Sequence, residues 1–300
     1  MTLDRGEVHD RWAAWLLDRR FGGDTAQRDA MLPALYVYRD EVLRRAAIRP
    51  GDVVLDVGCG DGLIGFGAAD LVGPSGRVVF TDISADLLAV CRDIAASSAD
   101  PADTQTSRFA FVQTGLPALD GIGSNSVDVA TTRSVLIYVD DIAGSFGALH
   151  RVLRPGGRLS IFEPINRFGR DDRADRLWGF DMSGLEPIAV KVRQYYDAIA
   201  PGLATMLAFD ERDLLRHAEA AGFEDLHLSY TAEVTRSGGG SVDDMLRRAP
   251  NPLVPPLGEI VAAALTPREE AALRERFAAE LGARRQDWRL ATAYLSATRA

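Results

Sequence analysis

The sequence predicts an α/β protein built on a seven-stranded sheet that is mostly parallel. Between about residues 50 and 164, short runs rich in β-branched residues alternate with longer segments of helical periodicity. This alternation is typical of a parallel sheet wound with crossover helices. Each apolar run is short and nearly uninterrupted, as expected of strands that are covered on both faces. A glycine-rich turn at 58–62 follows the first run and opens a helix.

Each element follows from a local pattern. Five strands are expected first, at 53–57, 77–81, 109–113, 127–131 and 158–163. Between them, helices are expected at 62–72, 85–96 and 142–153. The sequence Arg154-Pro155-Gly156-Gly157 then predicts a stop and a turn before the fifth strand.

The rest of the sheet is expected after residue 209. A helix at 210–221 begins with an aspartate cap and ends at Gly222. Two further strands are expected at 226–234 and 291–298, the last one antiparallel and inserted beside the sixth. These strands bring the total to seven.

Four regions follow from this reading. They are an N-terminal helical lid at 1–48, a sheet core at 49–164, a lid insertion at 165–209, and the rest of the sheet at 210–300 with a second insertion at 235–290. Ligands of open α/β sheets bind beyond the carboxyl ends of the strands. We therefore expect the N-terminal helices and the two insertions to form a lid over those ends.

Composition narrows the classes of partner. The net charge of −9 would repel nucleic-acid phosphates, and no Lys/Arg-rich stretch offsets it. The charged N-terminus has no apolar run suited to a leader or a membrane span, so a cytoplasmic protein without membrane partners is expected. Cys59 and Cys91 have no metal-ligand spacing, so neither a disulfide nor a metal site is expected. The oligomeric state is left open.

The glycine-rich turn reads G-x-G-x-G. A dinucleotide fingerprint counted from Gly58 would require glycine at position 63, where leucine stands. Aspartates at 56 and 61 flank the turn. Acidic side chains would repel a pyrophosphate, whereas they suit the cationic sulfonium and ammonium groups of S-adenosylmethionine (SAM).

Five motifs in chain order resemble those of class I SAM-dependent methyltransferases. They are the first strand and glycine turn, the second strand with its acidic end, the adenine-edge loop, the fourth strand with its following loop, and an R-x-L-x-P-G-G signature, at 54–62, 78–84, 113–117, 126–135 and 150–158. The resemblance is close over about residues 36–164. It implies a Rossmann-like fold, SAM as cofactor, and methyl transfer to a carbon, nitrogen or oxygen of a small molecule.

The resemblance also implies cofactor contacts. Asp82 would accept hydrogen bonds from both ribose hydroxyls, and Ile83 would lie against the adenine. The adenine loop lacks the family's usual aspartate, which leaves its remaining residues to make the contacts. A Tyr-Arg pair before the first strand could bind the SAM carboxylate. The further candidates lie in the turn, in the adenine loop and near the methionine end: Asp56, Gly58, Cys59, Gly60, Thr114, Gly115, Leu116, Tyr38, Arg39 and Arg133.

The acceptor end of the site is less defined. Glu163 ends the fifth strand and could orient or deprotonate an acceptor, or pair with Arg167. His9 could reach an acceptor from the lid, and Tyr195 and Tyr196 could line its pocket or pack their helix. We expect metal-free in-line displacement in specialised metabolism. A nicotinamide-dependent oxidoreductase and a non-catalytic SAM-binding regulator are the alternatives.

Overall fold

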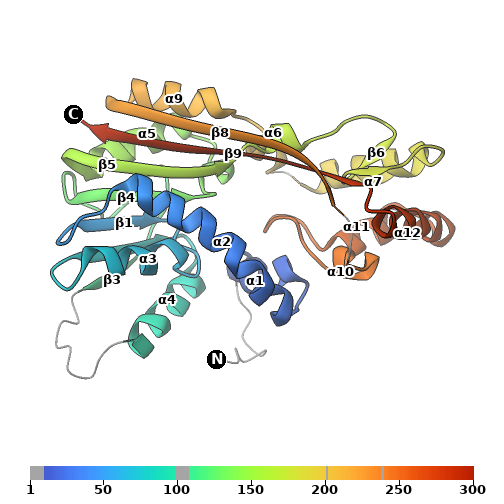
Figure 1. Cartoon of the computed structure of the whole chain (residues 1–300), viewed down its shortest axis with the longest axis horizontal. Helices are drawn as coiled ribbons and strands as arrows, with labels where there is room; N and C mark the ends of the chain where they lie inside the picture. Colours follow the sequence, from blue (N-terminus) through green and yellow to red (C-terminus); the bar gives the residue numbers. More distant parts are fainter. Residues whose placement is uncertain (1–9, 99–107, 201, 238–239) are drawn as a thin grey trace. The chain divides into compact units, whose positions relative to one another are not determined.

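The computed structural model (Figure 1) describes four stretches of the chain: residues 10–98, 108–200, 202–237 and 240–300. They form two compact units. The sheet unit comprises residues 31–164, 208–230 and 292–300, and the helical unit comprises the described residues within 1–30, 165–207 and 231–291. Three elements contribute residues to both units: α2 (Thr25–Ala46), β8 (Phe223–Ser237) and β9 (Gln286–Arg299).

The seven-stranded sheet has the order β3-β2-β1-β4-β5-β9-β8. The first five strands pair in parallel, and β9 pairs antiparallel with β5. Besides β8 and β9, the strands are β1 (Val53–Val57), β2 (Arg77–Asp82), β3 (Phe109–Gln113), β4 (Val127–Arg133) and β5 (Leu153–Pro164). The predicted α/β fold is confirmed, including the seventh strand inserted beside the sixth.

The four α-helices that follow the strands of the sheet unit begin within one residue of the expected positions, and the short η2 was not expected. These helices are α3 (Leu63–Val72), α4 (Ala85–Ser98), η2 (Leu136–Tyr138), α5 (Ile142–Val152) and α9 (Glu211–Ala220). The Asp141 side chain accepts the Gly144 N–H at the start of α5. Asp210 and Asp213 form a capping box at the start of α9, where each side chain accepts a backbone N–H of the other.

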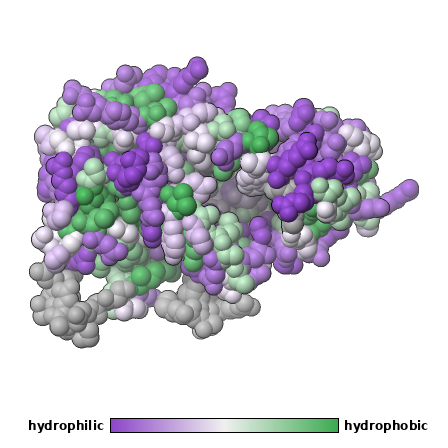
Figure 2. Space-filling view, viewed as in Figure 1, coloured by the Kyte–Doolittle hydropathy of each residue, from purple (hydrophilic) through white to green (hydrophobic). Residues whose placement is uncertain are grey.

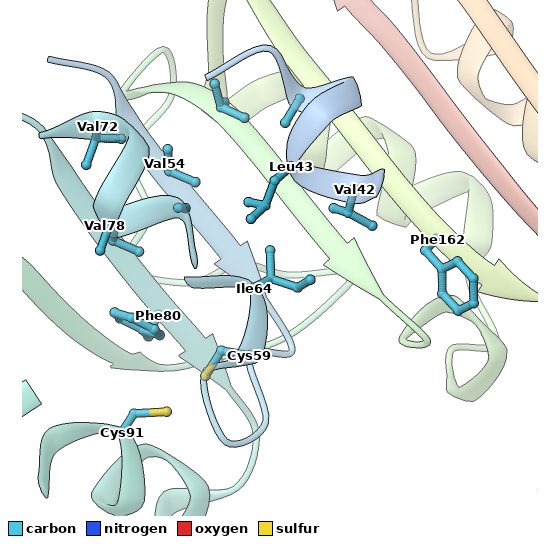
Figure 3. Packing of buried hydrophobic residues seen from close by; sticks show 14 of the residues in the cluster. Val42, Leu43, Val54, Cys59, Ile64, Val72, Val78, Phe80, Cys91 and Phe162 are labelled. Carbon is cyan, nitrogen blue, oxygen red and sulfur yellow. The ribbon is translucent and has the colours of Figure 1, made fainter. Parts of the chain in front are cut away.

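The core of the sheet unit packs on both faces of the sheet. Val54, Phe80 and Val129 share one buried cluster with residues of α2, α3 and α4 (Figure 3). Because successive side chains of a strand point to opposite faces, Leu55 and Ala130 face the other way, and both are fully buried. The sheet is therefore covered on both sides, as the uninterrupted apolar runs predicted.

Helix α3 packs unusually closely. A Cβ added at Gly65 would lie 2.2 Å from the Phe80 ring, and one at Gly67 would lie 2.7 Å from Leu43. Only glycine leaves room for this approach of α3 to β2 and α2. Both glycines therefore serve packing.

The predicted turn before the fifth strand lies inside β5. The helix ends at Val152 and the strand begins at Leu153, which pairs with Val127. The next pair is Val129 with Arg158, so the intervening residues of β5 form a bulge, with Gly156 at φ +76°. The Pro-Gly-Gly sequence thus interrupts the ladder without ending the strand.

The helical unit has its own core. Its elements are α1 (Arg11–Leu17), η1 (Arg19–Phe21), α6 (Asn166–Gly169), β6 (Arg176–Leu177), β7 (Phe180–Asp181), α7 (Glu186–Ile199), α8 (Leu203–Met206), α10 (Val242–Leu246), α11 (Leu257–Ala264) and α12 (Pro267–Gly282). Phe180 stacks on Phe277 with ring centroids 4.2 Å apart. Trp15 donates from Nε1 to the Ala249 carbonyl at 2.9 Å, which ties the N-terminal segment to the second insertion.

Its boundaries differ from the expected ones. The predicted lid at 1–48 divides near residue 30, because the later part of α2 packs in the sheet unit through Val42 and Leu43. Strands β8 and β9 extend into the predicted insertion at 235–290, and the short pair β6–β7 was not expected.

The surface in Figure 2 mixes hydrophilic and apolar residues. Among the described helices, none combines the length and apolar character needed to cross a membrane.

Candidate active site

Three parallel strands end together at the centre of the sheet. Val57 of β1 pairs with Thr81 of β2 and with Thr132 of β4. The residues that follow these three positions therefore emerge at one edge. The strand order reverses between β1 and β4, which is where ligands of open α/β sheets bind.

The turn after β1 depends on its glycines. Gly58, Gly60 and Gly62 have φ values of +65°, +56° and +85°. Residues other than glycine rarely adopt this backbone region. A Cβ at Gly58 would also lie 2.4 Å from Cγ2 of Val135. The turn thus presents bare backbone before the first turn of α3.

Asp82 sits beside this turn at the end of β2. Its side chain is nearly buried and accepts the Gly60 N–H on Oδ2 and the Ser84 N–H on Oδ1, both at 2.9 Å. An ionised carboxylate has about four acceptor positions, so it can accept hydroxyl hydrogens as well as N–H groups. The next residue, Ile83, is an apolar side chain that is 53% exposed.

The loop after β3 lies against the same residues. The Thr114 N–H donates to the Asp82 carbonyl at 3.1 Å, and Gln113 Nε2 donates to the Ile83 carbonyl at 3.1 Å. A Cβ at Gly115 would lie 2.6 Å from Cγ2 of Ile83. The structure therefore brings the predicted adenine-loop residues together with Asp82 and Ile83.

Arg133 ends β4 on the other side of the turn. Burial lowers the pKa of its guanidinium, which the negative charges of Asp61, Asp56 and Glu163 oppose. Within the described part of the chain, its side chain forms no hydrogen bond or ion pair. The edge therefore has a cation that can bind a carboxylate, surrounded by acidic groups.

Residues 48–176 match a family described as a methyltransferase domain. The chain carries a class I SAM-dependent methyltransferase domain. The prediction made from the five motifs is confirmed at this level.

Known proteins similar to this chain include enzymes that act on different molecules. A 2-phytyl-1,4-naphtoquinone methyltransferase of Nostoc sp. is 29% identical over 56% of this chain and 71% of its own length. An arsenite methyltransferase of Halobacterium salinarum is 34% identical over 40% of this chain. The match covers 29% of that relative, so the chain spans less than a third of its length.

A solved structure shows the same fold. The Haemonchus contortus phosphoethanolamine N-methyltransferase 2, in complex with phosphomonomethylethanolamine and S-adenosylhomocysteine, superposes with a TM-score of 0.51 at 16% identity. The alignment covers 88% of this chain and 52% of that one.

SAM is the cofactor of this methyltransferase domain, and the site residues fit it. The turn presents the backbone of Gly58 and Gly60 at positive φ, Asp82 can accept the ribose hydroxyls, and the exposed Ile83 offers an apolar surface for adenine. Arg133 has the charge to bind the carboxylate of the methionine end.

Asp56 has a different environment from the one expected. Its side chain is 1% exposed, and Oδ2 accepts the Gly65 N–H at 2.8 Å while Oδ1 accepts the Thr131 hydroxyl at 3.2 Å. Burial raises its pKa to about 7. Because the carboxyl bonds to Gly65 of α3 and Thr131 of β4, its side chain links these two elements at the site, and its contact with the cofactor stays a prediction. Cys59 is 6% exposed and offers mainly its backbone.

Glu163 is also turned inward. It is fully buried, and its carboxyl accepts backbone N–H groups of Val135, Leu136 and Ile137. Burial raises its pKa to about 7. These amides, and not the anticipated Arg167, are the hydrogen-bond partners of Glu163. A base that deprotonates an acceptor would need to be exposed to it, whereas the Glu163 side chain is fully buried.

The Tyr-Arg pair of α2 makes contacts within the protein. Tyr38 packs against Phe162 with ring centroids 4.9 Å apart. The Arg39 guanidinium lies 4.3 Å from the Tyr36 ring centroid and its Nε is 2.8 Å from Asp40. Arg39 also borders a groove of about 480 Å³ between α2 and α3, together with Leu43, Gly67, Asp70 and other residues of the two helices. The binding of the SAM carboxylate by Tyr38 and Arg39 stays a prediction.

The predicted acceptor residues are placed only in part. Tyr195 and Tyr196 pack against the core of the helical unit, and the Tyr196 hydroxyl accepts Asn251 Nδ2 at 3.1 Å. Tyr196 thus follows the packing alternative. His9 lies outside the described residues. No cluster of three His, Cys, Asp or Glu side chains suited to a metal occurs among the described residues.

Sequence reasoning missed the backbone amides of Val135, Leu136 and Ile137, which have no residue-type signature. The inward direction of Asp56 could have been found, because strand alternation places it on the same face as Val54, the face that packs against α3.

Proposed function

We propose that this protein transfers the methyl group of SAM to a carbon, nitrogen or oxygen atom of a small molecule by direct displacement. The observation that carries the proposal is the meeting of the glycine turn, Asp82 and Ile83 at the edge where the strand order reverses. SAM supplies an activated methyl group on a cationic sulfur. The acceptor atom bonds to the methyl carbon as the carbon–sulfur bond breaks, and the electron pair stays on sulfur.

The residues of the site act by positioning and by charge. Asp82 and the turn would fix the ribose and the backbone contacts of the cofactor, and Arg133 would hold its carboxylate. The carboxylates near Arg133 favour a cation at the same edge. Orienting a nucleophile about 3 to 3.5 Å from the methyl carbon can supply several kcal/mol of the barrier reduction. With Glu163 buried, we propose that transfer depends mainly on this positioning.

We further propose that the helical unit binds the acceptor. It combines residues 165–207 and 231–291 with the described part of the first 30 residues, and apart from residues 165–176 it lies outside the stretch 48–176 that matches the methyltransferase domain. The different acceptors in the names of the relatives agree with a variable acceptor region in addition to a shared cofactor domain. A role in specialised metabolism, in the cytoplasm, remains part of this proposal.

Calorimetry and a transfer assay test the proposal together. The protein should bind SAM and S-adenosylhomocysteine, should not bind NADH, and should transfer label from methyl-labelled SAM to a component of a pooled metabolite extract. Asp82→Ala should remove both signals. SAM binding with no transfer to any pool would support the non-catalytic regulator instead, and NADH binding without SAM binding would support the oxidoreductase.

A further inference from the structure

The segment after β4 forms an anion-binding concavity from its own backbone. Ser134 has φ +58°, and the N–H groups of the next three residues converge on one carboxyl. Val135 and Leu136 donate to Oε1 of Glu163 at 2.9 Å, and Ile137 donates to Oε2 at 3.4 Å. A left-handed residue followed by successive amides is the geometry of backbone nests that hold anions. Here a side chain of the protein fills the nest.

The same segment touches the cofactor turn. The Cβ direction of Gly58 points at Cγ2 of Val135, 2.4 Å from the ideal Cβ position, so the Val135 side chain packs directly on the Gly58 backbone. The Ser134 N–H donates to the Phe162 carbonyl at 2.9 Å, next to Glu163. A continuous chain of contacts therefore runs from the end of β5 through the post-β4 segment to the turn.

We propose that Glu163 is a positioning residue whose carboxyl holds the backbone of residues 134–137 so that Val135 fixes the SAM-binding turn at Gly58. The inference rests on the proposed function, because SAM affinity is its readout. Glu163 is fully buried, its carboxyl accepts the amides of residues 135–137, and it acts on the turn through Val135. Removing it would strand up to three buried N–H groups, a loss large enough to release the segment.

A double-mutant cycle on SAM affinity tests this chain of contacts. Glu163→Ala should raise the Kd for SAM about tenfold and Val135→Ala about fivefold, while the double variant should show little more than the larger single effect. Glu163→Gln keeps an acceptor oxygen for the Val135 and Leu136 amides and should restore most of the affinity. Hydrogen exchange should show faster exchange confined to residues 134–138 in Glu163→Ala.

The matched control is Glu280→Gln, which changes a nearly buried glutamate of the helical unit paired with Arg285 and should leave the SAM Kd unchanged. If the increase in the SAM Kd of the double variant equals the product of the increases in Glu163→Ala and Val135→Ala, the two residues act independently and the proposal is overturned. A Glu163→Gln variant with wild-type SAM affinity, normal exchange and a greatly reduced kcat would also overturn it, because that pattern belongs to a base.

Two further outcomes are distinguishable. If Glu163→Ala does not fold, the cycle is run with Glu163→Asp, whose shorter side chain withdraws the carboxyl from the amides, and multiplying effects overturn the proposal in the same way. If the wild-type protein does not bind SAM, the proposed function fails. Faster exchange of residues 134–138 in Glu163→Ala or Glu163→Asp would still support the backbone restraint.

Discussion

The buried carboxyls at the candidate site of the sheet unit and the surface carboxylates of the helical unit have different partners. In the sheet unit, Asp56, Asp82 and Glu163 are nearly or fully buried and accept backbone N–H groups. In the helical unit, carboxylates pair with basic side chains at the surface, as in Asp197 with Arg170 at 2.9 Å. The pKa values follow these environments: burial raises those of Asp56 and Glu163 to about 7, and the Lys191 ammonium helps lower that of Glu269 to about 2.

The difference shows where the protein requires fixed geometry. A backbone amide has a defined position, so a carboxyl bound to several amides is held in one orientation. A surface ion pair joins two long side chains, is screened by solvent, and contributes at most about 1 kcal/mol. The comparison therefore predicts large effects at few positions of the sheet unit and small effects at many positions of the helical unit.

The largest effect is expected at Asp82. Asp82→Ala removes both the acceptor of the ribose hydroxyls and the partner of the Gly60 N–H, so the SAM Kd should rise at least about 100-fold. Calorimetry measures this, and thermal unfolding checks that the variant is folded. Asp197→Ala in the helical unit is the control and should bind SAM normally. An equal loss of SAM affinity in Asp82→Ala and Asp197→Ala would contradict the difference between the units.

Removing residues 1–30 tests the role of the helical unit. The truncation deletes the hydrogen bond from Trp15 to Ala249, while the turn and Asp82 remain. Turnover should fall about tenfold or more, with less than about a threefold change in SAM affinity, because only a step needing the acceptor is affected. Steady-state kinetics with the acceptor found in the transfer screen and calorimetry with SAM separate the two quantities. Full activity would place acceptor binding elsewhere.

The pH dependence of stability should come from the sheet unit. Asp56 and Glu163 have folded-state pKa values of about 7, above their ordinary values of 3.8 and 4.5, so the folded chain binds these protons more tightly. Their contribution to stability is complete below the ordinary values and is lost as pH rises through about 7. The midpoint temperature of thermal unfolding should therefore decrease as the pH is raised from 5 to 8, by on the order of a few degrees.

Glu163→Gln should show a smaller fall over this pH range, because the amide does not titrate. Glu269→Gln should leave the fall unchanged, since the lowered pKa of Glu269 places its titration below this range. Identical pH profiles for wild type and Glu163→Gln would contradict the assigned environment.

The smallest effect is expected for a surface ion pair of the helical unit. Arg170 lies 2.9 Å from Asp197 and 2.6 Å from Asp172, with all three side chains partly exposed. Arg170→Ala should change neither SAM affinity nor the unfolding midpoint measurably at 0.15 M salt. A decrease in SAM affinity or in the unfolding midpoint as large as that of Glu163→Ala would show that the helical unit also depends on fixed charge geometry.

The sequence by itself determined the sheet and the turn. The bounds of β1 and β3 agree with the expected 53–57 and 109–113, and the glycine turn lies where it was expected. These features depend on local causes: side-chain period, β-branched content and the conformations open to glycine. The place of the Asp82 carboxyl at the end of β2 was predicted from the resemblance of residues 78–84 to the second-strand motif of class I methyltransferases.

Only the tertiary structure decided where the other polar side chains point. Glu163 binds amides of a segment 26 to 28 residues earlier in the chain, and Tyr196 meets Asn251, 55 residues away. Backbone amides have no residue-type signal, and pairing over such distances depends on sheet register and on the packing of separate segments. Trp15 and Ala249 likewise meet only through the folded helical unit. A side chain at a strand end can face the ligand edge or the core, and the position of the neighbouring backbone decides which.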